Sequence, residues 1–366
     1  MNQYQAPTAA LHQWVVQLFS AAGSNPTEAQ QAADHLVGAN LAGHDSHGVG
    51  MVPRYISSLL NDELQLNQQI DIVLDSGNML IADGRAGLGQ AVAHQAMDKA
   101  IARTRENGLT LLGLRNAHHI GRIGHWAEMA IDAGLVAIHF TNAMGKSPIV
   151  APHGGVQARF VTNPFTVGIP RRDGEPLVLD FATSAIAHGK ARVAYNKKVQ
   201  VPAGSVIDAA GSPTRDPAVL FEEPLGALKT FAEHKGYALA MVCELLGAAL
   251  TGGVTTRPAN LPREFGVYNN MLAILFDPAR LGTGEQFETE TRGFIEWLQS
   301  ADLDETGKAL GGILVPGDPE RRMRRARAEH LPIDAGTMAQ LDQAAGQIRE
   351  ARDKGPGPLS TLCQPG

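Results

Sequence analysis

Apolar residues recur at helical spacing through the first sixty residues of the chain. The apolar positions of the first expected helix repeat every three to four residues, at Leu11, Val15, Leu18 and Phe19. Gly23 ends this run, and Asn25 and Pro26 are typical of the cap and the first position of a second helix, which is expected to reach about residue 42. The sequence therefore predicts a helical N-terminal segment.

Beyond residue 68, short apolar runs alternate with helical patterns. Strands are predicted at 70–74, 79–82, 109–114, 135–141 and 271–276, and helices at 90–106, 122–133, 237–250, 285–299 and 334–352. Asp173 and Gly174 supply the turn of a hairpin between 165–170 and 177–181. This alternation predicts an α/β layer architecture. We expect residues 1–75 and 283–366 to form one discontinuous helical domain, and residues 76–282 to form an α/β domain.

Composition narrows the class of function. The chain has 366 residues, of which 44% are hydrophobic and 19% charged, as in an ordinary globular protein of two or three domains. Its net charge of -6 gives no attraction to nucleic acid or to an anionic membrane surface, so neither partner is expected. The two cysteines, Cys243 and Cys363, fit a reducing compartment, and the N-terminus lacks a signal-peptide pattern. We expect a cytoplasmic location.

Two short polar runs, each of which contains a glycine, hold the candidate catalytic residues. They are HDSHG at 44–48 and NAHHIGR at 116–122. Buried polar groups need hydrogen-bond partners, so packed cores rarely contain such runs, whereas imidazole titrates near neutral pH and suits proton transfer. We interpret Ser46, His47 and His119 as parts of one reactive site. Asp45 is expected to be a structural acceptor at the end of a helix.

The patterns that could bind a metal or a nucleotide are less specific than the two polar runs. The histidines leave a metal site open as an alternative, but neither pair has the i, i+4 spacing of a zinc-binding helix, so no metal is expected. Gly87 and Gly89 precede a helix like a dinucleotide-binding loop, but Val92 ends the pattern, so a simple turn and helix start is the preferred interpretation. Several other positions fit phosphate or ribose contacts but equally fit ordinary turns or a solvated lysine: Thr162, Asn163, Asp180, Phe181, Ala182 and Lys235.

Five ordered motifs resemble those of the type 2 malate/L-lactate dehydrogenase family. They are HDSHGVGMVPRY, NAHHIGRIGHWAE, TNPF, LDFATSAIAHGK and EHKGYALAMVCELLGAALTGG, and the resemblance runs from about residue 10 to about residue 350. It implies an NAD(P)-binding domain that is not a Rossmann fold, with a mixed, antiparallel-rich sheet and flanking helices. It also implies a homodimer with the site near the subunit contact, and NAD or NADP as cofactor, with NAD slightly favoured.

The resemblance implies a role for each part of the two polar runs. His119 matches the family's general acid/base, and Ser46 and His47 match its active-site pair. Tyr55 matches a substrate-side tyrosine. The cofactor-side positions are Thr162, Asn163, Asp180, Phe181, Ala182 and Lys235.

One departure from the family concerns the substrate carboxylate. Many relatives have arginine where this chain has Met51, so another cation is expected to bind the carboxylate. Arg122 is the candidate because it follows His119 by three residues and has the fork geometry that carboxylates fit. Arg54 and Arg192 are the next candidates. The apolar Met51 indicates room for a larger or aromatic 2-substituent.

The sequence thus predicts an NAD(P)H-dependent oxidoreductase that interconverts 2-oxo acids and 2-hydroxy acids. The cofactor supplies the hydride, and His119 handles the proton. An alternative within the same class is a cyclic imine reductase of the piperideine-2-carboxylate type. Alternatives of other classes are a histidine-dependent metallohydrolase and a ligand-binding protein without catalytic activity.

Overall fold

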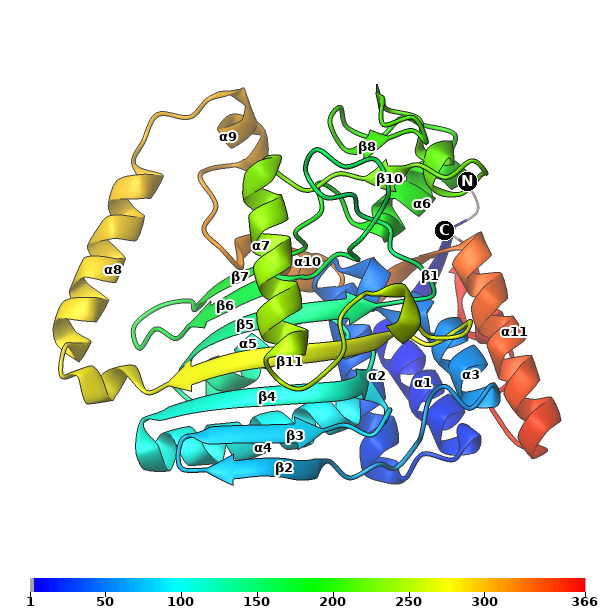
Figure 1. The fold of residues 1–366 in the computed structure, drawn as a ribbon, viewed down its shortest axis with the longest axis horizontal. Coiled ribbons are helices and arrows are strands. Elements are labelled where there is room, and N and C mark those ends of the chain that lie inside the picture. The colour runs from blue at the N-terminus through cyan, green and yellow to red at the C-terminus, as the bar shows by residue number, and fades with distance from the viewer. Residues whose placement is uncertain (1–2, 366) are drawn as a thin grey trace.

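A seven-stranded sheet forms the centre of the computed structural model, which describes residues 3–365 (Figure 1). In spatial order its strands are β2 (Asp71–Ser76), β3 (Met79–Asp83), β4 (Leu109–His118), β11 (Tyr268–Phe276), β5 (Val136–Met144), β6 (Phe165–Ile169) and β7 (Leu177–Phe181). Only β3 and β4 pair in parallel, and the other five pairings of this sheet are antiparallel. The predicted mixed, antiparallel-rich sheet is therefore confirmed.

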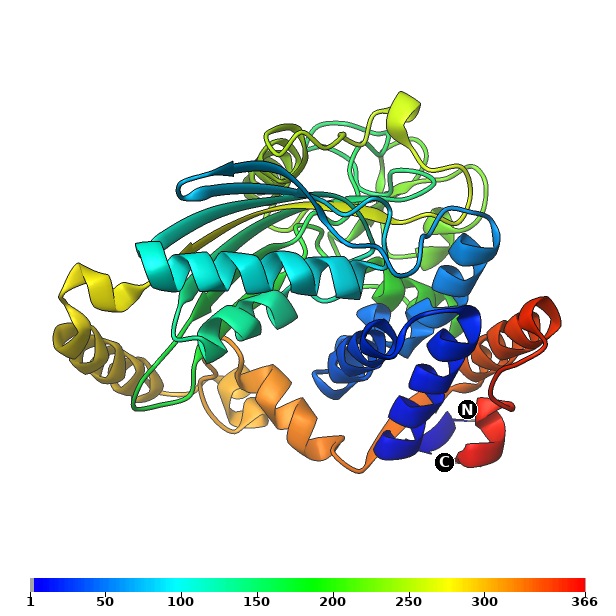
Figure 2. The same cartoon turned by 90° about the horizontal axis from the view of Figure 1, so that it is seen from below.

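Helices cover both faces of this sheet. On one face lie α4 (Gly89–Asn107) and α5 (Gly124–Asp132), which Figure 2 shows beneath the strands. On the other lies α7 (His234–Glu244), which continues as a π-helical turn over Leu245–Ala249. Gly247 permits the close approach of this turn to β5, because an added Cβ would lie 2.8 Å from the carbonyl oxygen of Phe140.

The N-terminal and C-terminal segments share one hydrophobic core. It joins α1 (Thr8–Ala22), α2 (Pro26–Leu41), α3 (Val52–Leu60) and α11 (Ala335–Arg352). The four predicted apolar positions of the first helix are all buried, and Asn25 caps α2 by accepting from the backbone N–H of Glu28. The antiparallel pairing of β1 (Gln3–Pro7) with β12 (His330–Asp334) was not predicted, because each segment has only five residues and contains a proline, which argues against a strand.

The remaining elements lie around this frame. A small sheet contains β8 (Val206–Ile207), β9 (Pro213–Thr214) and β10 (Ala227–Leu228), with α6 (His188–Asn196) near it. The chain then adds α8 (Gly284–Gln299), α9 (Glu305–Leu310) and α10 (Asp318–Ala326). In both views α8 and α11 lie at opposite ends of the molecule, so α8 stands apart from the core shared by head and tail (Figures 1 and 2). The proposed domain boundaries stay a prediction.

Within residues 3–365, no helix combines the length and the apolar character needed to cross a membrane. Cys243 and Cys363 are both free cysteines.

Candidate active site

The two polar runs meet in space. His47 ends a short 3-10 turn over Asp45–His47 that follows α2, and His119 directly follows β4. His47 Nδ1 lies 3.3 Å from His119 Nε2, and the two rings stack with an interplanar angle of 16°. Residues 72 positions apart in the sequence thus form one imidazole pair.

The first run is held rigidly by its neighbours. The Asp45 carboxylate accepts from Asn40 Nδ2 and from Arg327 Nη1, each at 2.7 Å. Asn40 Oδ1 in turn accepts from the backbone N–H of Val49 at 2.8 Å. A Cβ at Gly48 would lie 2.1 Å from that same oxygen, so the loop can close on Asn40 only with glycine there. Asp45 is a structural acceptor, as predicted.

The second run is fixed by backbone hydrogen bonds to side chains. The Ile120 N–H donates to Asn269 Oδ1 at 2.9 Å, and the Arg122 N–H donates to His35 Nε2 at 2.8 Å. Gly121 has a φ of +74°, and a Cβ there would lie 2.1 Å from His35 Nε2. The chain therefore turns sharply around His35, and this turn fixes the position of His119.

Burial keeps both imidazoles of the pair neutral. Desolvation lowers the pKa of His47 to about 4, although the negative charge of Asp180 acts in the opposite direction. Desolvation also lowers the pKa of His119 well below its usual value, and the neighbouring His47 and His118 add to this effect. Two neutral rings can share a hydrogen bond, whereas two imidazolium rings at this distance would repel each other.

Tyr55 lies behind His119. Its ring is fully buried, and its hydroxyl lies 2.6 Å from His119 Nδ1. Gln90 Nε2 donates to this hydroxyl at 3.0 Å and to the His119 carbonyl oxygen at 3.2 Å. The predicted substrate-side tyrosine is thus in contact with the proposed acid/base residue. Gln90 was not predicted, because its sequence context is only the start of a helix.

Ser46 and Met51 frame the same region. Both are half-buried, and Met51 packs against the core of the helical segments. The start of α6 lies directly over Ser46, because a Cβ at Gly189 would lie 2.7 Å from Ser46 Cβ. One turn further along α6, the exposed Arg192 guanidinium lies 3.7 Å from the centroid of the Phe221 ring. No carboxylate of residues 3–365 forms an ion pair with Arg192.

Arg122 belongs to a buried ion cluster. Its side chain is 2% exposed, and Nη2 donates to Glu128, whose carboxylate also accepts from Arg324 at 2.8 Å. Arg122 Nη1 lies 3.9 Å from Asp180 Oδ2 and has no hydrogen-bond partner among the described residues. Carboxylates therefore partly neutralise the guanidinium, which the sequence did not predict, but Nη1 keeps no hydrogen-bond partner among residues 3–365.

Asp180, at the end of β7, connects this cluster to the predicted cofactor side. Its Oδ1 accepts from Thr166 Oγ1, and its Oδ2 accepts from the Gly124 N–H, each at 2.8 Å. A Cβ at Gly124 would lie 2.4 Å from Arg122 Nη1. Glycine there lets the start of α5 approach both charged groups.

The Thr162–Asn163 segment is tied to the loop that follows β7. The Thr162 carbonyl accepts from the backbone N–H of Thr183 at 2.9 Å. Asn163 is fully buried: its Oδ1 accepts from the Ala143 N–H, and its Nδ2 donates to Glu244 Oε2 at 2.7 Å. The Asn163 side chain therefore shapes this loop and is already bonded on both sides. The buried Glu244 was not predicted.

The last three cofactor-side positions lie beside the end of β7. The Phe181 ring packs edge-on against the Phe231 ring, with a distance of 5.3 Å between the ring centroids. The Phe231 carbonyl accepts from the Gly236 N–H at the start of α7. Lys235 is exposed there, and Ala182 is half-buried. In residues 3–365 no acidic side chain forms an ion pair with Lys235. Asp180, Phe181 and Ala182 therefore lie at the end of β7, and Thr162, Asn163 and Lys235 lie on segments that contact this end or are adjacent to such a contact.

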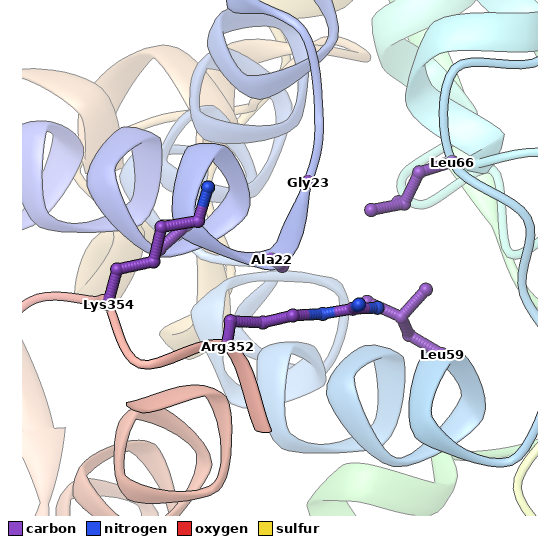
Figure 3. Close-up of a pocket in the computed structure, with 7 residues that line it drawn as sticks. Ala22, Gly23, Leu59, Leu66, Arg352 and Lys354 are labelled. Carbon is purple, nitrogen blue, oxygen red and sulfur yellow. The ribbon is translucent and has the colours of Figure 1, made fainter. Parts of the chain in front are cut away.

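Other features point away from this place or from a metal centre. A cavity of about 290 Å³ lies among the ends of α1, α3 and α11, lined by residues that include Leu59, Leu66, Arg352 and Lys354 (Figure 3). It contains no residue of either polar run, so it is not the reactive centre. Across the described part of the chain, no group of three or more His, Cys, Asp or Glu side chains is arranged to hold a metal ion.

Comparisons with known proteins identify the family of this chain. The family model described as malate/L-lactate dehydrogenase matches residues 6–342. Hydroxycarboxylate dehydrogenase B of Escherichia coli (strain K12) is 46% identical over 365 residues, which are 99% of this chain and 98% of that protein. A Delta(1)-pyrroline-2-carboxylate/Delta(1)-piperideine-2-carboxylate reductase of Pseudomonas syringae pv. tomato is 33% identical over 90% of this chain and 93% of its own length.

A comparison with solved structures indicates the same family. An E. coli protein described as a malate/lactate dehydrogenase superposes with a TM-score of 0.91 at 44% identity, covering 98% of each chain. The matched region includes both polar runs, β7 and α7. This protein therefore belongs to the malate/L-lactate dehydrogenase family.

Proposed function

We propose that this protein is an NAD(P)-dependent 2-hydroxycarboxylate dehydrogenase, which interconverts a 2-oxo acid and the corresponding 2-hydroxy acid. The observation that carries the proposal is the His47–His119 pair, with Tyr55 hydrogen-bonded to the far nitrogen of the buried His119. Family membership supplies the reaction class, and this pair supplies the proton-transfer group that such a reaction needs.

The residues around the end of β7 fit a nicotinamide dinucleotide. Lys235 offers an exposed positive charge for a phosphate. Thr162, Asp180 and Ala182 would line the same place, with Asn163 and Phe181 shaping it. When bound, the nicotinamide ring supplies or accepts the hydride at C2 of the acid. We propose NAD ahead of NADP, and titration with both cofactors tests this preference.

His119 is the proposed general acid and base. In reduction the protonated ring gives its Nε2 proton to the oxygen that forms on C2 and becomes neutral, and in oxidation the unprotonated Nε2 of the neutral ring takes that proton back. His47 and Ser46 hydrogen-bond the reacting oxygen or hold the nicotinamide side of the site. The lowered pKa of both imidazoles favours neutral rings, each with one donor and one acceptor nitrogen, so His119 gains a proton before it acts as the acid in reduction.

We propose that Arg122 binds the substrate carboxylate through its unpartnered Nη1. The ion pair of Arg122 with Glu128 offsets part of its positive charge. Arg192 is therefore the second candidate for the substrate carboxylate. Arg192 follows the turn of α6 that packs on Ser46. Met51 leaves an apolar wall on the substrate side, so a larger or aromatic 2-oxo acid is the proposed substrate.

A steady-state assay tests the function. A panel of aliphatic and aromatic 2-oxo acids is offered with NADH and with NADPH, and the loss of cofactor absorbance is followed. We expect turnover with at least one of these acids. A folded protein that binds the cofactor but turns over no acid of the panel would contradict the proposal.

The same assay addresses two alternatives. Turnover of a cyclic imine, with none of any 2-oxo acid, would favour a role like that of the more distant P. syringae relative, in which the proton goes to nitrogen. Hydrolytic activity that a chelator abolishes and zinc restores would favour the metallohydrolase. We expect the dehydrogenase activity to survive chelation.

We also propose that the protein works as a homodimer in the cytoplasm. The outer face of α7 and of the turn that follows it exposes large apolar side chains: Met241, Val242, Leu245 and Leu250. Such a face is typical of a surface covered by another subunit. This face of α7 is the proposed contact. Light scattering at assay concentration tests it, and an active monomer would contradict it.

A further inference from the structure

A chain of hydrogen bonds runs from α4 to the reacting ring, and Gln90 at its far end has no role assigned above. Gln90 is 1% exposed, and its Nε2 donates to the Tyr55 hydroxyl at 3.0 Å and to the His119 carbonyl oxygen at 3.2 Å. The Tyr55 hydroxyl lies 2.6 Å from His119 Nδ1 but 3.5 Å from that carbonyl oxygen. On the other side of the ring, Nε2 faces His47 Nδ1.

The two hydrogens of the Gln90 amide decide where the tyrosine proton points. One is donated to the Tyr55 oxygen and the other to the His119 carbonyl oxygen, which Tyr55 could otherwise use as an acceptor. The acceptor that remains for the Tyr55 O–H, and also the nearer of the two, is His119 Nδ1. An imidazole nitrogen that accepts a hydrogen bond carries no proton, so the neutral ring carries its proton on Nε2.

We infer that Gln90 is a positioning residue: by occupying the His119 carbonyl oxygen, it keeps the Tyr55 hydroxyl turned onto Nδ1 and the His119 proton on Nε2. The inference rests on the proposed function, in which the Nε2 side of His119 faces the substrate oxygen and the neutral ring donates a hydrogen bond to the bound 2-oxo group before the ring is protonated for transfer. A neutral ring with its proton on Nδ1 instead would present no donor on that side.

The surroundings of the ring are consistent with this role. The titratable and charged groups around His119 are His47, His118, Arg54, Tyr55 and His35. Burial, followed by His47, His118 and Arg54, lowers the pKa of His119, so the ring is neutral near pH 7. Burial raises the pKa of the Tyr55 phenol above its usual value, so its hydroxyl stays protonated and can donate.

The inference predicts opposite pKa changes for two neighbouring substitutions. Protonation of His119 places a hydrogen on Nδ1, so Tyr55 must accept it and turn its own hydrogen toward the carbonyl oxygen that Gln90 occupies. Gln90→Met frees that oxygen and should raise the pKa of His119 by about one pH unit, the size of one hydrogen bond. Tyr55→Phe leaves the Nδ1 hydrogen without a partner, so it should lower the pKa or leave it unchanged.

Nitrogen NMR of the full chain labelled with ¹⁵N-histidine measures this directly and needs no turnover. His119→Gln identifies the His119 signals. We expect the wild type to show a protonated Nε2 and an unprotonated Nδ1, and Gln90→Met to show proton population on Nδ1 together with the raised pKa. The matched control is Gln95→Met on the same helix, whose amide bonds the Gln68 carbonyl and the Ile70 N–H instead. It should match the wild type.

A kinetic readout separates positioning from general loosening of the fold. In the pH profile of kcat/KM for reduction, the apparent pKa assigned to His119 should be higher in Gln90→Met than in the wild type. KM for the 2-oxo acid should stay near the wild-type value. Gln90→Glu, whose carboxylate would accept from Tyr55, should move the pKa further in the same direction. It serves as the second variant if Gln90→Met does not fold.

The outcomes are separable. A folded Gln90→Met or Gln90→Glu protein with the wild-type proton distribution and the wild-type pKa at His119 would overturn the inference. Equal pKa changes in Gln90→Met, Gln95→Met and Tyr55→Phe would also overturn it, because they would reflect loosening alone. Absence of turnover with every 2-oxo acid would defeat the proposed function, while the NMR result would still test the hydrogen-bond chain.

Discussion

Two histidine pairs lie within the same part of the molecule, and we propose a catalytic role for only one of them. His47 and His119 stack at a ring-centroid distance of 5.4 Å, and His35 and His125 contact each other at 4.5 Å. Burial lowers the pKa of all four imidazoles. Burial and a displaced pKa therefore do not distinguish a reactive histidine from a structural one.

The hydrogen-bond partners do distinguish them. His35 Nε2 accepts from the backbone N–H of Arg122, a group that can only donate, so its role is fixed. His119 is bonded by the Tyr55 hydroxyl and by the His47 ring, each of which can either donate or accept. A histidine that must gain and lose a proton needs partners that can change role with it.

The largest expected effect comes from removing one ring of each pair. His119→Ala should lower kcat by roughly 10² to 10⁴, the usual contribution of a general acid/base, while the Kd for NADH stays unchanged. His125→Phe, which keeps a ring against Trp126, should keep kcat near the wild-type value. Steady-state kinetics and cofactor fluorescence measure both. Equal losses in the two variants would remove the distinction between the pairs.

The next effect concerns the arginine that follows the reactive pair. Arg122→Met should raise KM for the 2-oxo acid by about 10- to 150-fold, the loss of one charge-assisted contact, with little change in the Kd for NADH. Arg192→Met is the matched variant on α6. If it raises KM while Arg122→Met changes only thermal stability, the carboxylate contact belongs to Arg192, and Arg122 is a structural ion-pair residue.

Substrate size gives a smaller effect. Met51→Arg should shift the kcat/KM preference toward smaller and more polar acids, by about 10-fold for one new charge-assisted contact. Competition between pyruvate and phenylpyruvate measures this ratio. An unchanged ratio would mean that Met51 does not face the substrate.

The smallest effect is a pH dependence of stability, to which the structural pair contributes. Burial lowers the pKa of His125 to about 4, so the unfolded chain binds a proton there more readily than the folded chain does. Its contribution to stability is complete above pH 6.5 and is lost as the pH falls toward 4, at about 1.4 kcal/mol per pH unit. Urea unfolding at pH 7 and pH 5 measures the loss. His125→Phe should reduce it, and an unchanged slope would contradict this assignment.

The comparison also shows what the sequence could predict. The strands of the central sheet and the long helices were predictable because apolar spacing reports burial. The meeting of the two polar runs was predictable because their residue types are costly in a core without partners. Motif order then supplied the family, which local patterns could not supply.

Other features depend on contacts that no local pattern contains. Gln90, His35 and Glu244 act through partners that are 29 to 87 residues away in the sequence. The neutralisation of Arg122 depends on Glu128, which is itself shared with Arg324 across 196 residues. The sequence suggests a substrate-binding role for a guanidinium near a candidate catalytic histidine, and only the fold reveals that the same group also has a carboxylate partner within the protein.

One isotope experiment tests the central claim most directly. The wild-type protein is incubated with a 2-oxo acid and NADH that carries deuterium in the transferable position of nicotinamide C4, and the product is analysed by mass spectrometry and proton NMR. We predict a 2-hydroxy acid with one deuterium at C2, formed in a 1:1 ratio with oxidised cofactor, and at least 100-fold more slowly by His119→Ala. A product without deuterium at C2, or an equal rate in His119→Ala, would contradict the account.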